Sequence, residues 1–210
     1  MQSAEVVLRV LRVLVEAGRP LMLREIALAA GMAPAKVHRY LVSLVREGYV
    51  SQAGAGGVYD LGPFALELAL ASLSRLDSVR VAGAVLPDLC RRVDETVALA
   101  LWGSRGPMFV RWEEPPHPVA SSIRAGSLIP VLRSASGRVL AAHLPAEIVD
   151  PFIAQELEDS ARNRRAHGPR SRRAVDQMLA EVRSSGLARV AGDLMTGVNA
   201  ISAPVFDHRS

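Results

Sequence analysis

The chain has 210 residues, enough for one large domain or two modest ones. Half of the residues are hydrophobic and 22% are charged, which excludes a mainly disordered protein. Charges, glycines or prolines interrupt every apolar stretch before 18 residues, so no transmembrane helix is expected. The N-terminus does not resemble a secretory signal. The single cysteine, Cys90, excludes an intramolecular disulfide, and we therefore expect a cytoplasmic protein.

The positive charge of the chain is concentrated in two stretches. The net charge is +4, but residues 33–46 carry three basic residues and residues 162–173 carry six, with no acidic residue in either stretch. Local basicity of this kind is typical of a nucleic-acid-binding surface. For residues 162–173 a solvent-exposed loop is favoured over a DNA contact, because this stretch lies far along the chain from the first.

Three short helices are predicted at the start of the chain. Apolar residues recur on one face over residues 6–14, and again over residues 23–30. Gly31 then follows where a left-handed turn favours a residue without a side chain. Pro34 suits the first turn of a third helix, which Gly48 ends.

A β-hairpin is predicted after the third helix, because Tyr49-Val50 and Val58-Tyr59 flank a glycine-rich centre. This order of elements is typical of a winged helix-turn-helix domain, over residues 1–62, whose third helix enters the DNA major groove. Lys36 and Arg39 are the strongest candidates, because they lie in the first half of that helix. The side chains predicted to contact DNA are Arg24, Lys36, His38, Arg39, Ser43, Arg46, Gln52 and Tyr59. A winged-helix module that binds a protein instead of DNA is the alternative.

The segment 23–50, LREIALAAGMAPAKVHRYLVSLVREGYV, resembles the DNA-binding domain of the IclR family of transcriptional regulators. The likeness rests on Val37-His-Arg-Tyr-Leu41, Glu47-Gly-Tyr-Val50 and Tyr59-Asp-Leu-Gly62. Where the family often has Ser-Thr, this chain has Ala35-Lys36. We therefore expect an electrostatic phosphate contact at Lys36 rather than a neutral hydrogen bond.

Residues 63–77 form a predicted linker helix that is too apolar for an isolated, exposed segment. It is expected to pack either on the same helix of a second subunit or on its own chain, and its periodicity does not distinguish these possibilities. The resemblance favours the first, because the family forms dimers or tetramers. Two subunits would also present two recognition helices to a pseudo-palindromic site.

Residues 78–210 alternate helical and strand patterns, which predicts an α+β domain with an antiparallel sheet and flanking helices. Cys90 falls in an apolar helical stripe and is expected to be a small buried hydrophobic residue. Residues 124–142 and 197–207 resemble the IclR effector-binding domain. That resemblance implies a GAF-like fold and a pocket for small organic acids or aromatic metabolites. The family normally continues with a strand and a helix beyond the point where this sequence stops.

A candidate effector site follows from the small residues at 134–137, which precede a helix whose first N–H groups would attract a carboxylate. An ordinary serine N-cap is the more frequent explanation of such a pattern. The family commonly has a pair of acidic residues shortly before the strand that starts near Gly197, whereas this chain has only Asp193 there. Some members have a polar or thiol residue at the position of Ala200, so the resemblance implies a more apolar pocket in this chain. The predicted effector-binding residues are Arg111, Leu132, Ser134, Ala135, Gly137, Asp193, Asn199 and Ala200.

An enzyme is the less favoured alternative. The sequence has no G-x-S-x-G, P-loop, H-E-x-x-H or dinucleotide motif, and its five histidines lack metal-ligand spacing. Ser136 and His143 lie about 10 Å apart on a helix, too far for a nucleophile and its base. We therefore expect no cofactor and no metal. The prediction is a homodimeric or tetrameric regulator, either a repressor or an activator, which binds double-stranded operator DNA and a small-molecule effector.

Overall fold

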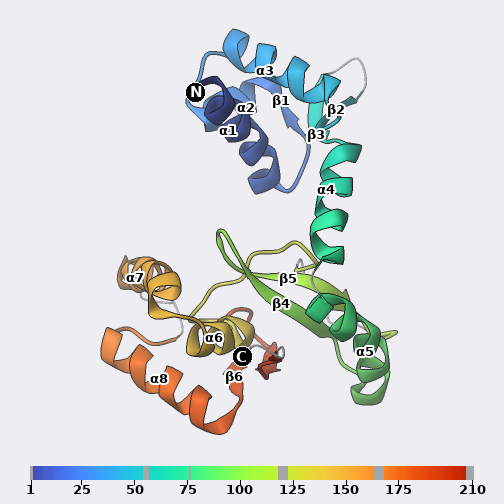
Figure 1. The fold of residues 1–210 in the computed structure, drawn as a ribbon. Coiled ribbons are helices and arrows are strands. Elements are labelled where there is room, and N and C mark those ends of the chain that lie inside the picture. The colour runs from blue at the N-terminus through green and yellow to red at the C-terminus, as the bar shows by residue number, and fades with distance from the viewer. Residues whose placement is uncertain (1, 54–56, 76, 118–122, 163–167, 207–210) are drawn as a thin grey trace. The chain divides into compact units, whose positions relative to one another are not determined.

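The computed structural model describes residues 2–53, 57–75, 77–117, 123–162 and 168–206. The chain divides into two compact units, Met1–Asp77 and Ser78–Ser210, hereafter unit 1 and unit 2 (Figure 1). Within the described ranges, no helix is both long enough and apolar enough to cross a membrane.

Unit 1 contains the three predicted helices, α1 (Gln2–Ala17), α2 (Leu23–Ala30) and α3 (Pro34–Arg46). Gly31 ends α2 in the left-handed conformation, with φ of 65°, as the sequence predicted. Pro34 occupies the first turn of α3. The helices are held together by a hydrophobic core whose fully buried side chains are Val10, Ile26, Val37 and Leu41 of the helices and Val50, which follows α3.

The predicted hairpin consists of β2 (Val50–Ala53) and β3 (Val58–Leu61), paired antiparallel. Residues 54–56, at its predicted tip, lie outside the described residues. A third strand, β1 (Leu21–Met22), pairs with β3 and was not predicted, because two residues are too short for a periodic pattern. Helix α4 (Pro63–Ser74) follows, and its Phe64 ring packs edge-on against Tyr49 with centroids 4.7 Å apart.

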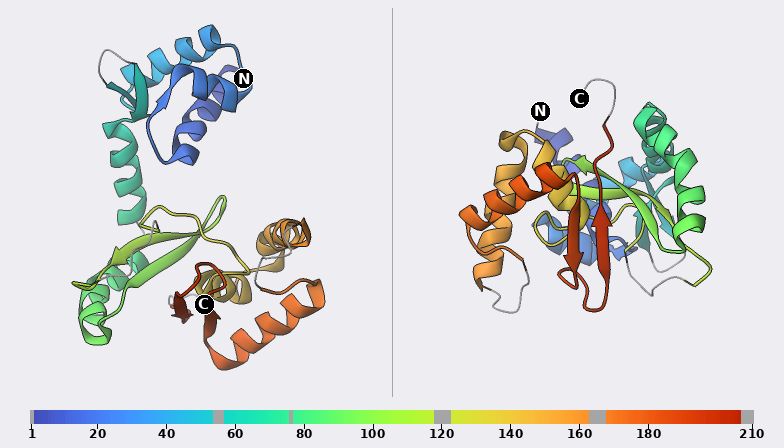
Figure 2. Two further views of the ribbon diagram at one scale, coloured as in Figure 1. Left: turned by 180° about the vertical axis from the view of Figure 1, so that it is seen from behind. Right: turned by 90° about the horizontal axis from the view of Figure 1, so that it is seen from below.

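Unit 2 is an α+β fold, as the sequence predicted. Its helices and strands are α5 (Asp77–Val93), β4 (Val97–Gly103), β5 (Gly106–Glu113), α6 (Ala135–His143), α7 (Ala146–Arg162), α8 (Arg172–Ser185), β6 (Ala188–Ala191) and β7 (Asn199–Ser202). The described strands form two small antiparallel sheets, β4–β5 and β6–β7, rather than the single predicted sheet. Figure 2 shows β6 and β7 running side by side in opposite directions.

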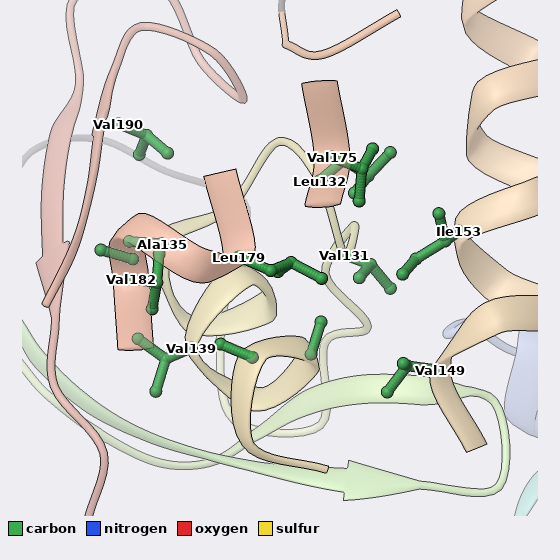
Figure 3. Close-up of a cluster of buried hydrophobic side chains, with 13 residues drawn as sticks. Val131, Leu132, Ala135, Val139, Val149, Ile153, Val175, Leu179, Val182 and Val190 are labelled. Carbon is green, nitrogen blue, oxygen red and sulfur yellow. The ribbon is translucent and has the colours of Figure 1, made fainter. Parts of the chain in front are cut away.

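The core of unit 2 is built around α6, which packs against α8 and against strands of both sheets. Val139 of α6, Ile153 of α7 and Val175 of α8 are each less than 5% exposed (Figure 3). Burial of such side chains is the main stabilising contribution to this unit. Cys90 is a buried free cysteine on α5, in agreement with the predicted packing role.

Candidate DNA-binding and effector-binding sites

The basic face of α3 consists of Lys36, Arg39, Ser43 and Arg46, all exposed. Spacings of three, four and three residues place these four side chains on one side of the helix. The opposite side faces the core of unit 1 and carries the buried Val37, Leu41 and Leu44. Core packing therefore fixes α3 with its basic face toward solvent.

The charges of this basic face are free to bind an external anion. Among the described residues, no acidic side chain lies within 4 Å of the charged groups of Lys36, Arg39 or Arg46. The first turn of α3 also contains no acidic residue. A row of unpaired cations on a helix that faces solvent is the arrangement which a phosphate backbone attracts.

The remaining predicted DNA contacts differ in exposure. Arg24 on α2 and Gln52 on β2 are exposed, and His38 is exposed on α3 beside the basic face. Tyr59 is the exception, because its side chain is 4% exposed and packs in the core of unit 1. The structure thus gives Tyr59 a packing role, and we omit it from the candidate surface.

Glu25 holds the start of α2 and was not singled out in the sequence. Its carboxylate accepts a hydrogen bond of 2.7 Å from the Met22 N–H and one of 2.8 Å from the Arg19 guanidinium. Both hydrogen bonds lower the pKa of Glu25 below its usual range, and the bond from the Met22 N–H has the larger effect. The sequence does contain a signal for this contact, because Glu25 stands three positions after Met22, the N-cap residue of α2, as in a capping box.

At the start of α6, Ser134 is an N-cap residue. Its Oγ accepts a 2.9 Å hydrogen bond from the Gly137 N–H and donates one of 2.6 Å to the Pro130 carbonyl. Ser134, Leu132 and Ala135 are each at most 5% exposed. The more frequent explanation of this pattern, an ordinary serine cap, is therefore what the structure shows, and the hydroxyl is occupied internally.

A partly buried carboxylate supports the segment before α6. Glu156 of α7 accepts hydrogen bonds from the N–H groups of Val131 and Leu132, the second at 2.9 Å. Burial raises the pKa of Glu156 above its usual range, although the two N–H groups and the Arg133 charge oppose the shift. Glu156 lies 25 positions along the chain from Val131 and 24 from Leu132. Contacts over such separations leave no local signal in the sequence, so this glutamate was not predicted.

The Glu156 carboxyl predicts a pH dependence of stability. Its pKa is higher in the folded than in the unfolded chain, so its contribution to stability is largest below the ordinary glutamate pKa. That contribution is lost as the pH rises through the folded pKa. Glu156→Gln removes the titration. We expect the free energy of unfolding of the wild type, relative to that of the variant, to fall as the pH rises from the ordinary glutamate pKa through the raised pKa of the folded chain.

Urea unfolding followed by tryptophan fluorescence measures this difference, because both tryptophans, Trp102 and Trp112, lie in unit 2. A difference that stays constant or grows over this pH range would contradict the assignment.

The other predicted effector residues are distributed over three places. Asp193, in the β6–β7 connection, forms an ion pair of 2.5 Å with Arg138 of α6. Asn199 and Ala200 are exposed on β7, a strand that packs against α6. Arg111 lies on β5, and its Nε is 3.4 Å from the position that a Cβ on Gly83 of α5 would occupy. The structure therefore places Arg111 beside α5.

A small cavity of about 220 Å³ lies where the end of α5 meets the end of β5. Its lining residues are Pro87, Cys90, Arg91, Asp94, Glu113, Glu114, Pro115 and Pro116. None of these is a predicted effector residue.

Two arginines of residues 162–173, Arg162 and Arg172, have acidic neighbours. Arg172 contacts Asp150 and Asp176 at 2.8 Å each, and Arg162 lies within 4 Å of Glu158 and Asp159. Residues 163–167, which include Arg164 and Arg165, lie outside the described residues. The pairing of Arg162 and Arg172 reduces their availability to DNA, which supports the surface-loop interpretation.

Comparison with known proteins identifies two family regions that together span nearly the whole chain. Residues 3–54 match the IclR helix-turn-helix domain, and residues 70–210 match the family described as bacterial transcriptional regulator IclR C-terminal. The transcriptional regulator KipR of Bacillus subtilis is 30% identical over 191 residues, which are 90% of this chain and 74% of KipR.

Solved structures show the same similarity. The crystal structure of Pseudomonas aeruginosa HmgR is 36% identical, with a TM-score of 0.78, over 100% of this chain and 85% of HmgR. An IclR homologue from Microbacterium hydrocarbonoxydans, solved in complex with 4-hydroxybenzoate, has the same fold. It gives a TM-score of 0.81 at 23% identity, over 97% of this chain and 82% of the homologue. This chain belongs to the IclR family of transcriptional regulators.

Proposed function

We propose that this protein regulates transcription in the cytoplasm as a homodimer that binds double-stranded operator DNA through α3 and responds to a small organic acid. The observation that carries the proposal is the basic face of α3, which is exposed, unpaired among the described residues and opposite the core-facing side of the helix. In a winged helix-turn-helix domain this face lies in the major groove.

The exposed polar side chains of unit 1 are suited to contact different parts of the DNA. Lys36 and Arg39, near the start of α3, are suited to phosphates or guanine edges, and Gln52 on β2 can donate to a neighbouring groove. The exposed Arg24 at the start of α2 adds a phosphate contact. Binding through these groups should weaken steeply with salt, because condensed counterions are released from the DNA.

The exposed apolar surface of α4 supports the homodimer. Leu66, Leu68 and Leu70 are 54–62% exposed, and they lie on more than one side of the helix. Apolar side chains on a short, exposed helix are typical of a protein–protein interface. A second copy of α4 would cover them and would set the separation of the two α3 helices.

The dimer predicts that charge on α4 separates the subunits. We expect Leu66→Glu/Leu70→Glu to convert the protein to a monomer at micromolar concentration, measured by analytical ultracentrifugation, because two buried carboxylates per subunit would have to be desolvated. Leu28→Glu is the matched control, since Leu28 on α2 is 85% exposed. A double variant that associates as strongly as the wild type would contradict the interface.

The effector is proposed to be a small organic acid or an aromatic acid, because the Microbacterium hydrocarbonoxydans homologue was solved with 4-hydroxybenzoate. In unit 2, the exposed Asn199 and Ala200 of β7 offer an amide and an apolar surface, and β7 packs against α6. Effector binding would shift the balance between two arrangements of the linker helices, which requires different affinities for the two arrangements.

The proposed function is tested with DNA from the promoter region beside the gene. Fluorescence anisotropy measures binding over a salt series, with and without a panel of small carboxylic acids that begins with 4-hydroxybenzoate. We expect salt-sensitive binding that at least one acid of the panel changes. Binding that no member of the panel changes would contradict regulation by an acid. The absence of specific DNA binding at low salt would favour the protein-interaction module.

A further inference from the structure

Arg138 joins three separate segments of unit 2. Its guanidinium donates from Nε to the Leu132 carbonyl at 2.7 Å, from Nη1 to the Arg189 carbonyl at 2.8 Å, and from Nη2 to Asp193 at 2.5 Å. The side chains of Arg138 and Asp193 are only 11% and 19% exposed. A planar guanidinium with five N–H donors can make such a three-way contact, whereas a lysine ammonium cannot reproduce its geometry.

Two of the three partners of Arg138, Leu132 and Asp193, are residues that the sequence predicted to bind the effector. Leu132 belongs to the segment that leads into α6, and its N–H is held by Glu156 of α7. Arg189 and Asp193 belong to β6 and the β6–β7 connection. Within that connection, the Gly192 N–H donates a hydrogen bond to the Val198 carbonyl, and the Val198 N–H donates one to the Met195 carbonyl.

We infer that Arg138 is the positioning residue of the effector response: it locks the β6–β7 connection to the start of α6, so that the two regions move together. The Asp193 carboxylate is occupied by this ion pair and acts through Arg138, not as an effector ligand. The inference rests on the proposed function for its regulatory meaning, but the coupling itself does not depend on any ligand or on DNA.

Hydrogen exchange of the full chain, read by mass spectrometry, tests the coupling. In Arg138→Met we expect exchange of the amides in residues 191–198 to rise by about tenfold or more, because a local opening no longer breaks a partly buried ion pair. Asp193→Asn should have a similar effect, and the double variant should exchange no faster than the single variants. Arg138→Lys should restore part of the protection, since it keeps a charge near Asp193.

Arg183→Met is the matched control. Arg183 of α8 also donates from a guanidinium to a backbone carbonyl, that of Ala142, at 2.8 Å, and among the described residues it forms no hydrogen bond or ion pair with residues 191–198. Its removal should leave exchange in that connection unchanged. Unchanged exchange in Arg138→Met, or additive effects of the two single variants, would overturn the inference.

The promoter-binding assay separates this inference from the proposed function. If Arg138→Met raises hydrogen exchange in residues 191–198 but the wild type does not bind DNA specifically, the coupling is supported and the proposed function is contradicted. If the wild type responds to an acid, Arg138→Met should keep its DNA affinity, because α3 belongs to unit 1, and should lose at least most of the response.

Discussion

Lys36→Ala/Arg39→Ala is expected to lower the affinity for promoter DNA by about 30-fold or more. Each contact of an α3 cation with a phosphate or a guanine edge contributes about 1–3 kcal/mol. Both side chains are exposed and have no acidic partner among the described residues, so the substitution removes binding groups without breaking an internal contact. The slope of log affinity against log salt should also fall, by about 0.9 for each phosphate that the variant no longer neutralises.

The matched control for this variant is Arg91→Ala/Arg92→Ala. It removes the same charge from exposed positions in the last turn of α5, in unit 2. Anisotropy with the same DNA fragment should show a change of less than about threefold, since charges that do not belong to the binding surface act only through a screened field. Equal losses in the two double variants would mean that net charge, and not α3, determines the binding.

Gly137→Ala is expected to destabilise unit 2 by about 3 kcal/mol. A Cβ on Gly137 would lie 2.4 Å from the Pro130 carbonyl oxygen and 2.7 Å from both the Val131 oxygen and the Ser134 Oγ. Two of these three neighbours are backbone atoms, which cannot turn away as a flexible side chain can. The substitution must therefore push the segment 130–134 off the start of α6 and disturb the Ser134 cap.

Gly83→Ala is the matched control in the same unit. Gly83 lies inside α5, and the nearest atom to its new Cβ would be the Arg111 Nε at 3.4 Å, an ordinary contact with a flexible side chain. We expect this variant to be stabilised by about 0.5–1 kcal/mol, because alanine loses less entropy than glycine in a helix. Urea unfolding followed by tryptophan fluorescence compares the two variants. A Gly137→Ala protein as stable as the wild type would contradict the close packing at α6.

The elements of unit 1 were predictable because each has a local signal. Gly31 in the left-handed region and Pro34 in the first turn of α3 fix the two ends of a tight turn, and helical periodicity fixes the face of α3 that is buried. Strand β1 was missed because its only support is pairing with β3. Tyr59 was predicted as a DNA contact because a strand pattern cannot say which of its two faces is buried.

The candidate effector site was less predictable, because its organisation depends on contacts between distant residues. The small residues at 134–137 indicated a tight helix start, and Ser134 is indeed its cap. Both partners of Glu156, and two of the three partners of Arg138, lie 24 to 55 positions away in the sequence. Such pairings are set by the packing of α6, α7 and β6, which no local pattern specifies. The IclR resemblance supplied the fold class but not these partners.

The central claim is that α3 recognises a particular DNA sequence, and the most direct measurement of this is the specificity ratio. Anisotropy at about 150 mM salt, where nonspecific attraction is screened, compares the promoter fragment with a scrambled fragment of the same composition. We predict that the wild type binds the promoter fragment about 10³-fold or more tightly than the scrambled one. Equal affinity for the two fragments would contradict sequence-specific recognition by this protein.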